Sequence, residues 1–335
     1  MDPLTHGVAS FALQRAFFPR ASWRSVVAFV SAGVIADVDW FTAALGPSAY
    51  IERHRTATHS FLFVVVLAIA ALLFSRSAKN VVGGIWAGFS WLPVAATGLL
   101  HLFLDVLQTE YIALLWPFSS RRFALDILPS LEPWLLTILI AAILVPELFL
   151  LVNEEIGSRS KRPRGRNAAI TGLAFVVVYL GFRALLHANT IAALEAHTIA
   201  GEMPRRAAAF PDPTSPFLWH SIVETQSTLN LVVMRSMGGE VGYASGVTTL
   251  HKPESSPILT AAQNSPAAAV FVKFARFPKA TLQAETEGYS VEIQDLKDQA
   301  IAEKSRAIFA DVNLDKNSRV ISSELQWQKN LTGAR

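Results

Sequence analysis

The sequence contains no cysteine and little charge. Only 16% of its 335 residues are Asp, Glu, Lys or Arg, against roughly 25% in an average soluble protein. Hydrophobic residues make up 52%, and the mean hydropathy is +0.36. The lack of cysteine excludes disulfides, thiolate metal ligands and cysteine nucleophiles. The low charge excludes intrinsic disorder and a basic nucleic-acid-binding arm, so no nucleic-acid partner is expected.

The charge is unevenly distributed along the chain. Residues 1–189 hold 26 charged residues, or 14%, whereas residues 190–335 hold 29, or 20%. We therefore expect a membrane-embedded domain over residues 1–189, a linker over 190–216 and a soluble domain over 217–335.

Charge-free apolar runs predict the membrane helices. A spanning helix needs about 17–25 apolar residues, and the run Asn80–Leu104 meets that length comfortably. Together with the N-terminal helix described next, the runs predict about six helices. The shorter runs are Ser25–Ala36, Phe61–Ser75, Pro133–Pro146 with an extension to Val152, and Asn167–Phe182.

The first two helices are expected to form a hairpin. Asp2 is a favourable N-cap and Pro3 suits the first helical position, which predicts a helix over residues 3–18. Pro19 ends it, and Ser22 can cap a second helix over residues 22–37. The antiparallel arrangement brings His6 and Asp37 to one membrane level, within about 8 Å, since paired metal ions lie roughly 3.5–4 Å apart.

Basic residues predict the orientation in the membrane. The hairpin turn, the loop after Phe61–Ser75 and the loop 153–167 carry 10 Lys and Arg, whereas loops 37–60 and 105–132 carry 4. The basic side is expected to be cytoplasmic. A multi-pass protein of the bacterial inner membrane follows, in contact with membrane lipids and with its C-terminal domain outside the cytoplasm. The ten basic residues are Arg15, Arg20, Arg24, Arg76, Lys79, Arg159, Lys161, Arg162, Arg164 and Arg166.

Alternating and β-branched patterns predict a small antiparallel β domain after residue 216. The stretch 311–322 resembles a calcium loop, but it lacks the glycine and the final glutamate, so we expect a hairpin turn. His220 and His251 have no carboxylate at ligand spacing and are expected to be structural. The predicted strands are Ile222–Met234, Gly242–Leu250, Val270–Phe277, Tyr289–Glu292 and Arg319–Glu324.

Four of the eight histidines fall at the outer ends of the predicted helices, where carboxylates also gather. His101 and Asp105 are four residues apart and share a helix face. Imidazole and carboxylate ligands suit zinc or another divalent transition metal, which would activate water for hydrolysis. The candidate ligands are His6, Asp37, Asp39, His59, His101 and Asp105, for one or two ions.

Other interpretations stay open. Each histidine taken alone could be an interfacial polar residue, although ionisable residues beside membrane helices are functional candidates. The protein could be non-enzymatic, with a structural or regulatory metal and a partner-binding β domain. It could also be a cation transporter, but transporters place their ligands near the bilayer midplane, whereas these lie at helix ends.

The motifs HRTATHS at 54–60, HLFLD at 101–105 and WPFSSRRF at 116–123 resemble the bacterial membrane-bound metal-dependent hydrolase family. That family includes the LexA-binding inner-membrane proteins, and the resemblance covers roughly residues 1–125. Thr56 departs from the glycine common in the family. The family is distantly similar to zinc-dependent phospholipase C and the fungal single-strand nucleases, which implies that Asp105 could bridge two ions.

The resemblance implies a phosphoester or a lipid-related ester as the substrate. Asp39 and His54 are the candidate catalytic groups, since no separate base is identifiable. Arg121 and Arg122 could hold a substrate phosphate bidentately, or anchor lipid headgroups beside Trp116. Arg55 is the third candidate substrate-binding residue.

Overall fold

The computed structural model describes residues 1–19, 21, 23–81, 91–155, 165–301 and 307–328. Several residues used above lie outside that part of the chain, namely Arg20, Ser22, Arg159, Lys161, Arg162 and Arg164. The chain divides into two compact units. The first comprises residues 1–39, 55–186 and 213–216, and the second comprises residues 40–54, 187–212 and 217–335.

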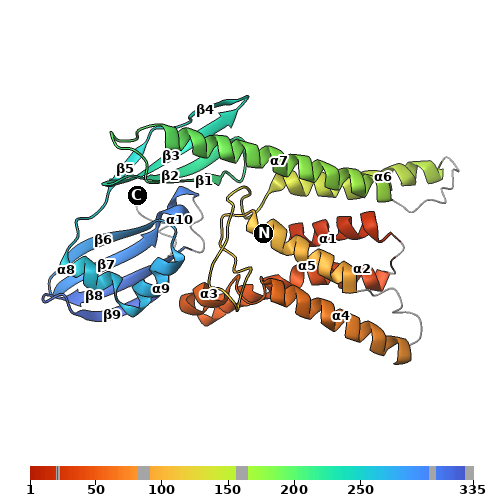
Figure 1. The fold of residues 1–335 in the computed structure, drawn as a ribbon, viewed down its shortest axis with the longest axis horizontal. Helices are drawn as coiled ribbons and strands as arrows, with labels where there is room; N and C mark the ends of the chain where they lie inside the picture. The colour runs from red at the N-terminus through yellow and green to blue at the C-terminus, as the bar shows by residue number, and fades with distance from the viewer. Residues whose placement is uncertain (20, 22, 82–90, 156–164, 302–306, 329–335) are drawn as a thin grey trace. The chain divides into compact units, whose positions relative to one another are not determined.

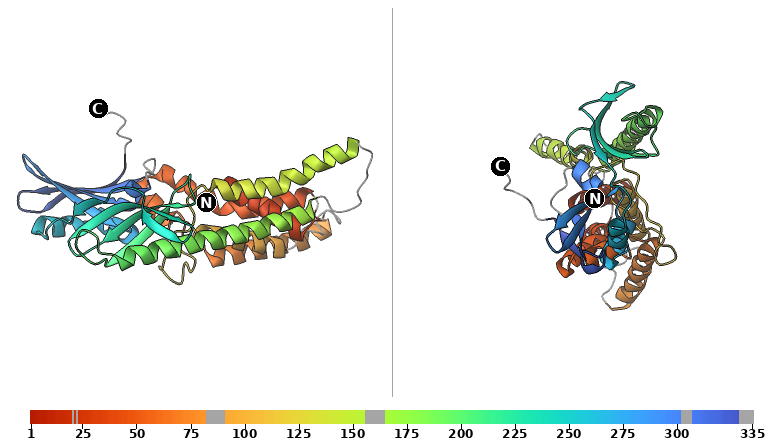
Figure 2. Two further views of the ribbon diagram at one scale, coloured as in Figure 1. Left: turned by 90° about the horizontal axis from the view of Figure 1, so that it is seen from above. Right: turned by 90° about the vertical axis from the view of Figure 1, so that its left-hand side faces the viewer.

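The first unit is helical (Figure 1). Its α5 contacts α1, α2 and α4, and α1 also contacts α6, so these helices run alongside one another (Figure 2). The predicted start of α1 is confirmed, because Asp2 caps Thr5 N at 2.9 Å with Pro3 at the first position. The elements are α1 (Pro3–Phe17), α2 (Trp23–Val34), η1 (Ile35–Leu45), α4 (Phe61–Val81), α5 (Trp91–Val106), α6 (Pro133–Glu155) and α7 (Arg166–Ala196).

Within the described residues, two segments are long and apolar enough to cross a membrane, Ser25–Leu45 and Arg166–Ala196. Of the run Asn80–Leu104, in which one helix was predicted, Asn80 and Val81 belong to α4 and Trp91–Leu104 to α5, and residues 82–90 lie outside the described residues. Trp91–Val106 has 16 residues and counts among the shorter apolar helices.

Two further expectations about the helices need correction. Arg76 and Lys79 lie inside α4 and not in a loop, because the helix continues through them to Val81. The second helix changes to 3₁₀ geometry at Ile35, so Asp37 and Asp39 lie on η1. The apolar run beyond Pro146 does continue as one helix to Glu155.

The second unit contains antiparallel sheets, as predicted. In the first sheet the order is β1-β2-β3-β4, and β5 also pairs with β3. Residues 206–211, which fall in the expected linker, form its first strand. The strands are β1 (Arg206–Pro211), β2 (Leu218–Glu224), β3 (Thr228–Met237), β4 (Glu240–Tyr243) and β5 (Thr248–His251).

The second sheet has the order β6-β7-β8-β9. One of its faces packs on α8 and α9 (Figure 1), through residues such as Val291, Val312 and Phe271. Tyr50 and Ile51 of α3 join the same core. The elements are α3 (Pro47–Arg53), α8 (Pro257–Gln263), α9 (Pro266–Phe274), β6 (Pro278–Glu285), β7 (Gly288–Asp295), α10 (Leu296–Ala300), β8 (Ile308–Asp315) and β9 (Val320–Trp327).

Three strand predictions differ from the structure. Val270–Phe277 is not a strand, because α9 covers it through Phe274. Ile222–Met234 is a β2–β3 hairpin that turns at residues 225–227, and not one strand. Gly242–Leu250 holds the end of β4 and most of β5, which both pair with β3. The hairpin turn predicted within 311–322 is confirmed, and Asp315 Oδ1 accepts hydrogen bonds there from Asn317 N and Arg319 N.

Candidate metal centre

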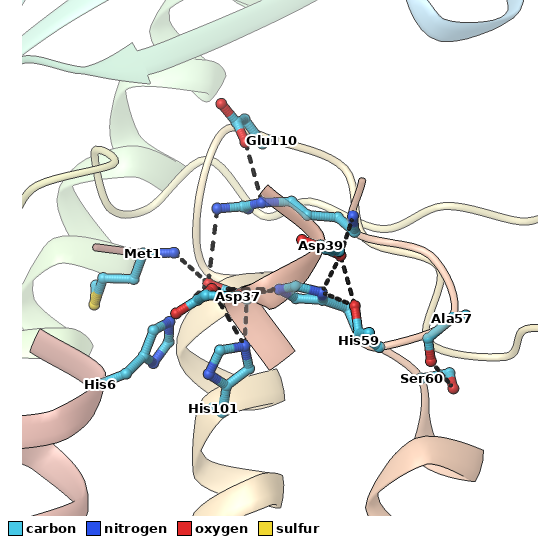
Figure 3. A network of polar contacts seen from close by, with 12 residues as sticks. Met1, His6, Asp37, Asp39, Ala57, His59, Ser60, His101 and Glu110 are labelled. Carbon is cyan, nitrogen blue, oxygen red and sulfur yellow. Dashed lines mark hydrogen bonds and ion pairs between the residues drawn. The ribbon is translucent and has the colours of Figure 1, made fainter. Parts of the chain in front are cut away.

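Three elements of the first unit bring four candidate ligands together (Figure 3). His6 comes from the first turns of α1, Asp37 from η1, and His101 and Asp105 from the last turns of α5. One ligand atom from each lies within 4.8 Å of the others, a grouping that could hold a metal ion. The predicted closeness of His6 and Asp37 is thereby confirmed.

Asp105 lies at the middle of this group and is fully buried. Its Oδ1 is 3.2 Å from His6 Nε2 and also contacts the N-terminal amine of Met1. Its Oδ2 is 3.0 Å from His59 Nε2 and 3.3 Å from His101 Nε2. The two oxygens therefore face different imidazoles, so an ion bound by Asp105 would have imidazole nitrogens close by.

The His101 ring is oriented by the backbone of α2. Its Nδ1 lies 2.8 Å from Gly33 O, and a carbonyl oxygen can only accept, so Nδ1 carries the proton and Nε2 presents a lone pair to the cluster. Within the described residues, His101 Nε2, Asp105 Oδ2 and Asp37 Oδ2 have no hydrogen-bond partner, although they are buried. Close approach without hydrogen-bond geometry, together with a backbone acceptor behind the ring, is typical of metal-ligating histidine.

Asp39 orients His59 in the same way. Asp39 Oδ2 lies 3.0 Å from His59 Nδ1 and accepts hydrogen bonds from Arg55 N at 2.8 Å and Thr58 Oγ1 at 2.6 Å. With its Nδ1 facing Asp39, the ring presents Nε2 to Asp105. Asp39 thus lies behind His59 and outside the group formed by His6, Asp37, His101 and Asp105.

The electrostatics of the cluster favour positive charge. Burial of His59 disfavours its imidazolium form, but the nearby carboxylates of Asp105, Asp37 and Asp39 outweigh this and raise the pKa of His59 to about 10. Carboxylates this deeply buried need a cationic or metal partner, and a divalent ion is one such partner.

Arg55 brings a permanently charged side chain close to the cluster. Its side chain is buried, with Nη2 3.8 Å from Asp105 Oδ1 and 2.8 Å from Gln108 Oε1, and Nε 3.0 Å from Glu110 Oε2 (Figure 3). The backbone has a φ of 55°, which is uncommon for a residue with a side chain. Sequence reasoning missed Gln108 and Glu110 as partners, although both follow directly on the HLFLD motif.

The other predicted site residues lie elsewhere. The His54 ring belongs to the second unit and stacks on Tyr50, with centroids 4.4 Å apart. Arg121 lies over the Phe123 ring at 5.2 Å, and burial lowers the pKa of Arg122. His220 Nε2 is 2.9 Å from Asp212 Oδ2, so the expectation of no carboxylate partner is wrong for His220, because the β1–β2 pairing joins the two.

A second buried charged group, Arg183, was also missed. Arg183 of α7 is fully buried and donates hydrogen bonds to Ile127 O, at 3.1 and 3.2 Å, and to Pro216 O at 2.6 Å. Glu132 accepts a hydrogen bond from Tyr179 Oη at 2.8 Å. The signal was Arg183 itself, a lone charge in an apolar helix. Arg183 holds the segment that follows the last ligand helix.

Comparison with known proteins agrees with the inner-membrane part of the resemblance. Neither the search of curated proteins nor the search of solved structures found a match. The YdjM inner membrane protein family matches residues 1–190, a range that holds every residue of the candidate metal centre. The match is consistent with the LexA-binding inner-membrane type and leaves the similarity to phospholipase C as an expectation. The chain therefore belongs to the YdjM inner membrane protein family.

Proposed function

We propose that this protein is a membrane-bound, metal-dependent hydrolase of phosphoesters. The observation that carries the proposal is the convergence of imidazole nitrogens and carboxylate oxygens on Asp105, with the rings of His101 and His59 oriented from behind by Gly33 O and Asp39. A set of histidine and aspartate ligands suits zinc or a similar divalent ion.

The membrane location of the proposed enzyme is supported by its family and its apolar helices. We propose a multi-pass arrangement in the inner membrane, with the cluster at the outer ends of the helices and the C-terminal unit outside the cytoplasm. The basic asymmetry of the loops supports this orientation. A substrate would then reach the site from the membrane surface, where lipid headgroups lie.

In this proposal His6, Asp37, His101 and Asp105 hold the ion, and His59 completes the set. A bound divalent ion supplies a Lewis acid and lowers the pKa of a water molecule. Hydrolysis adds the water oxygen to phosphorus and breaks one P–O ester bond, and the water proton passes to the departing alkoxide, which leaves as an alcohol.

The remaining predicted residues have proposed roles around that centre. Asp39 orients His59, and the catalytic role of His54 stays a prediction from the sequence. Arg121 and Arg122 are proposed to bind the substrate phosphate, because guanidinium groups pair bidentately with phosphate oxygens.

We propose that a single ion is bound. Arg55 already supplies a positive charge beside Asp105, with Nη2 3.8 Å from Oδ1, and an Asp105 that bridged two ions would bring a further positive charge close to this guanidinium. Like charges at that distance repel, so Arg55 disfavours the second ion.

Metal content and hydrolysis of the purified full chain test the proposal. We expect one divalent ion per chain and release of p-nitrophenol from bis(p-nitrophenyl) phosphate. Asp105→Asn should abolish both, whereas His251→Ala, on exposed strand β5, should retain both. Bound metal without hydrolysis would instead support the non-enzymatic alternative, and no bound metal would overturn the centre itself.

A further inference from the structure

The segment between α5 and α6 contains a loop, residues 112–123, that is closed at its base. Ile112 and Phe123 exchange two backbone hydrogen bonds of 2.9 Å and form an isolated antiparallel bridge. Ala113 N also donates a hydrogen bond of 3.0 Å to Arg55 O. The base of the loop is therefore fixed to the helical unit, and the tip has a defined position.

The tip of the 112–123 loop is apolar and exposed. It consists of Leu115, Trp116, Pro117 and Phe118, and the Phe118 side chain is 85% exposed. Leu115 and Trp116 are exposed as well, at 43% and 41%. Large apolar side chains that gather on a surface mark contact with a protein or with a membrane.

The backbone of the tip makes its hydrogen bonds within the turn. Phe118 N and Ser119 N donate to Leu115 O at 2.9 and 3.1 Å, and Trp116 N donates to a carbonyl of the loop at 3.1 Å. Pro117 has no N–H to satisfy. A segment that meets lipid needs such internal partners, because hydrocarbon offers none to the backbone.

The tip lies beside the start of an apolar stripe on α4. Phe61 N, at the first residue of α4, donates a hydrogen bond of 3.0 Å to Leu114 O, directly before the tip. Residues at every fourth position of α4 share one helix face, and this face is exposed at Phe61, Val65, Ile69 and Leu73. In a chain of an inner-membrane family, such a face suits the acyl chains of lipids, and the tip continues it at one end.

Basic side chains follow the apolar tip. Arg121 N donates a hydrogen bond to Ser119 Oγ at 3.2 Å, its guanidinium lies over the Phe123 ring, and Arg122 is the next residue. Aromatic side chains followed by arginine match a membrane surface, where acyl chains end and phosphate groups begin. A second protein chain would match the apolar tip and leave the charges without a purpose, whereas a phospholipid surface matches both.

We propose that the 112–123 loop is a membrane-surface anchor, with the side chains of Leu115, Trp116 and Phe118 inserted between the lipid headgroups and the acyl chains beside the start of α4. The inference is independent of the proposed hydrolysis. The chain between α5 and α6 then re-enters the membrane surface and is not simply a loop in water.

The anchor also sets the depth of the candidate metal centre. Ala113 of the loop is hydrogen-bonded to Arg55, whose Nη2 lies 3.8 Å from Asp105 Oδ1. With the loop held at the level of the headgroups, this short connection places Asp105 close to the same level.

Site-directed fluorescence tests the anchor, because the chain has no cysteine and a single one can be introduced. The full-length Phe118→Cys variant is labelled with bimane and placed in nanodiscs of phosphatidylcholine and phosphatidylglycerol that each hold one chain. We expect quenching by a nitroxide attached near the lipid headgroup, and loss of quenching by iodide in the water.

Two other exposed apolar positions are the matched controls. Ile321→Cys, on β9 and 69% exposed, should be quenched by iodide and not by lipid nitroxides. Ile69→Cys, about 12 Å from Phe61 along α4 at 1.5 Å per residue, should be quenched most strongly by a nitroxide in the middle of the acyl chain.

Each outcome decides the inference. Iodide quenching of the Phe118→Cys label as strong as that of the Ile321→Cys label would place the tip in water and overturn the anchor. Protection from iodide without nitroxide quenching would assign the tip to a contact with protein and overturn it too. Quenching by the headgroup nitroxide in nanodiscs that hold one chain would support the anchor, whether or not the protein hydrolyses bis(p-nitrophenyl) phosphate.

Discussion

One carboxylate oxygen, Asp39 Oδ2, accepts hydrogen bonds from the Arg55 amide and the Thr58 hydroxyl and also contacts the His59 ring. Asp39, which was expected to be a metal ligand, therefore holds His59, a proposed ligand, in place. Partners behind metal ligands typically contribute 10–100-fold to affinity. Their contribution is smaller than that of a direct ligand, which separates the two roles experimentally.

We predict that Asp39→Asn weakens zinc binding by about 10–100-fold, because His59 loses a charged acceptor. Zinc should still bind at saturating concentration. Titration with a competing chelator gives the affinity, and Asp105→Asn, which removes a proposed ligand, is the comparison. Equal loss of metal in both variants would assign Asp39 a direct role.

Acidic side chains oppose one another across three strands of the second sheet. Asp311 on β8 pairs directly with Glu292 on β7 and Glu324 on β9. Partial burial, followed by the charges of Glu292, Glu285 and Glu324, raises the pKa of Asp311. A raised folded-state pKa stabilises the fold at low pH, and that contribution is lost as the pH rises through it.

Asp311→Asn should therefore stabilise this sheet at pH 7 by about 0.2–1 kcal/mol, the scale of a cross-strand pair. Hydrogen exchange of β8 and β9 peptides in the full chain, compared with wild type at the same pH, measures the effect. The difference should shrink as the pH is lowered, because protonation removes the charge of Asp311 in the wild type. Faster exchange in the variant at pH 7 would refute the repulsion.

At the scale of elements, α1 and α2 pack tightly against each other at Gly33. A Cβ atom there would lie 2.0 Å from Ser10 Oγ and 3.0 Å from Ser10 Cβ. The Gly33 carbonyl also accepts the hydrogen bond from His101 Nδ1. One glycine thus couples the hairpin packing to the orientation of a proposed ligand.

We predict that Gly33→Ala lowers stability by about 1–3 kcal/mol, the usual cost of overpacking, and weakens zinc binding. Ser10→Gly in the same chain should restore both, since it removes the clashing atoms. Thermal unfolding in detergent and chelator titration provide the readouts. A double variant as impaired as the single one would show that Ser10 is not the obstacle.

Elements with strong local signals were predicted well. Asp2 and Pro3 identified the start of α1, and the HxxxD spacing placed His101 and Asp105 on one face. The helix α9 was missed because its β-branched and aromatic residues were given more weight than Ser265 and Pro266, a helix-start signal. The acceptor behind His101 had no sequence signal, since any residue supplies a backbone carbonyl.

At the scale of the whole molecule, orientation in the membrane is the main prediction. Reporter fusions at Arg164 and at Pro257 should report opposite compartments, with Arg164 cytoplasmic, because basic loops are retained on that side. Paired reporters that are active either inside or outside the cytoplasm provide the check. If both sites report one compartment, the proposed outer location of the metal centre fails with the topology.

Residues 40–54 belong to the second unit, whereas Asp39 and Arg55 on either side of them belong to the first unit, at the candidate centre. A 2.8 Å hydrogen bond from Arg55 N to Asp39 Oδ2 joins the two ends of this segment. Tyr50 and Ile51, inside it, are buried in the core of the second unit. A single recombination event near residue 190 would therefore separate α3 from its core. The C-terminal unit can be inherited, exchanged or lost intact only if residues 40–54 change with it, so the two parts are expected to evolve as one gene.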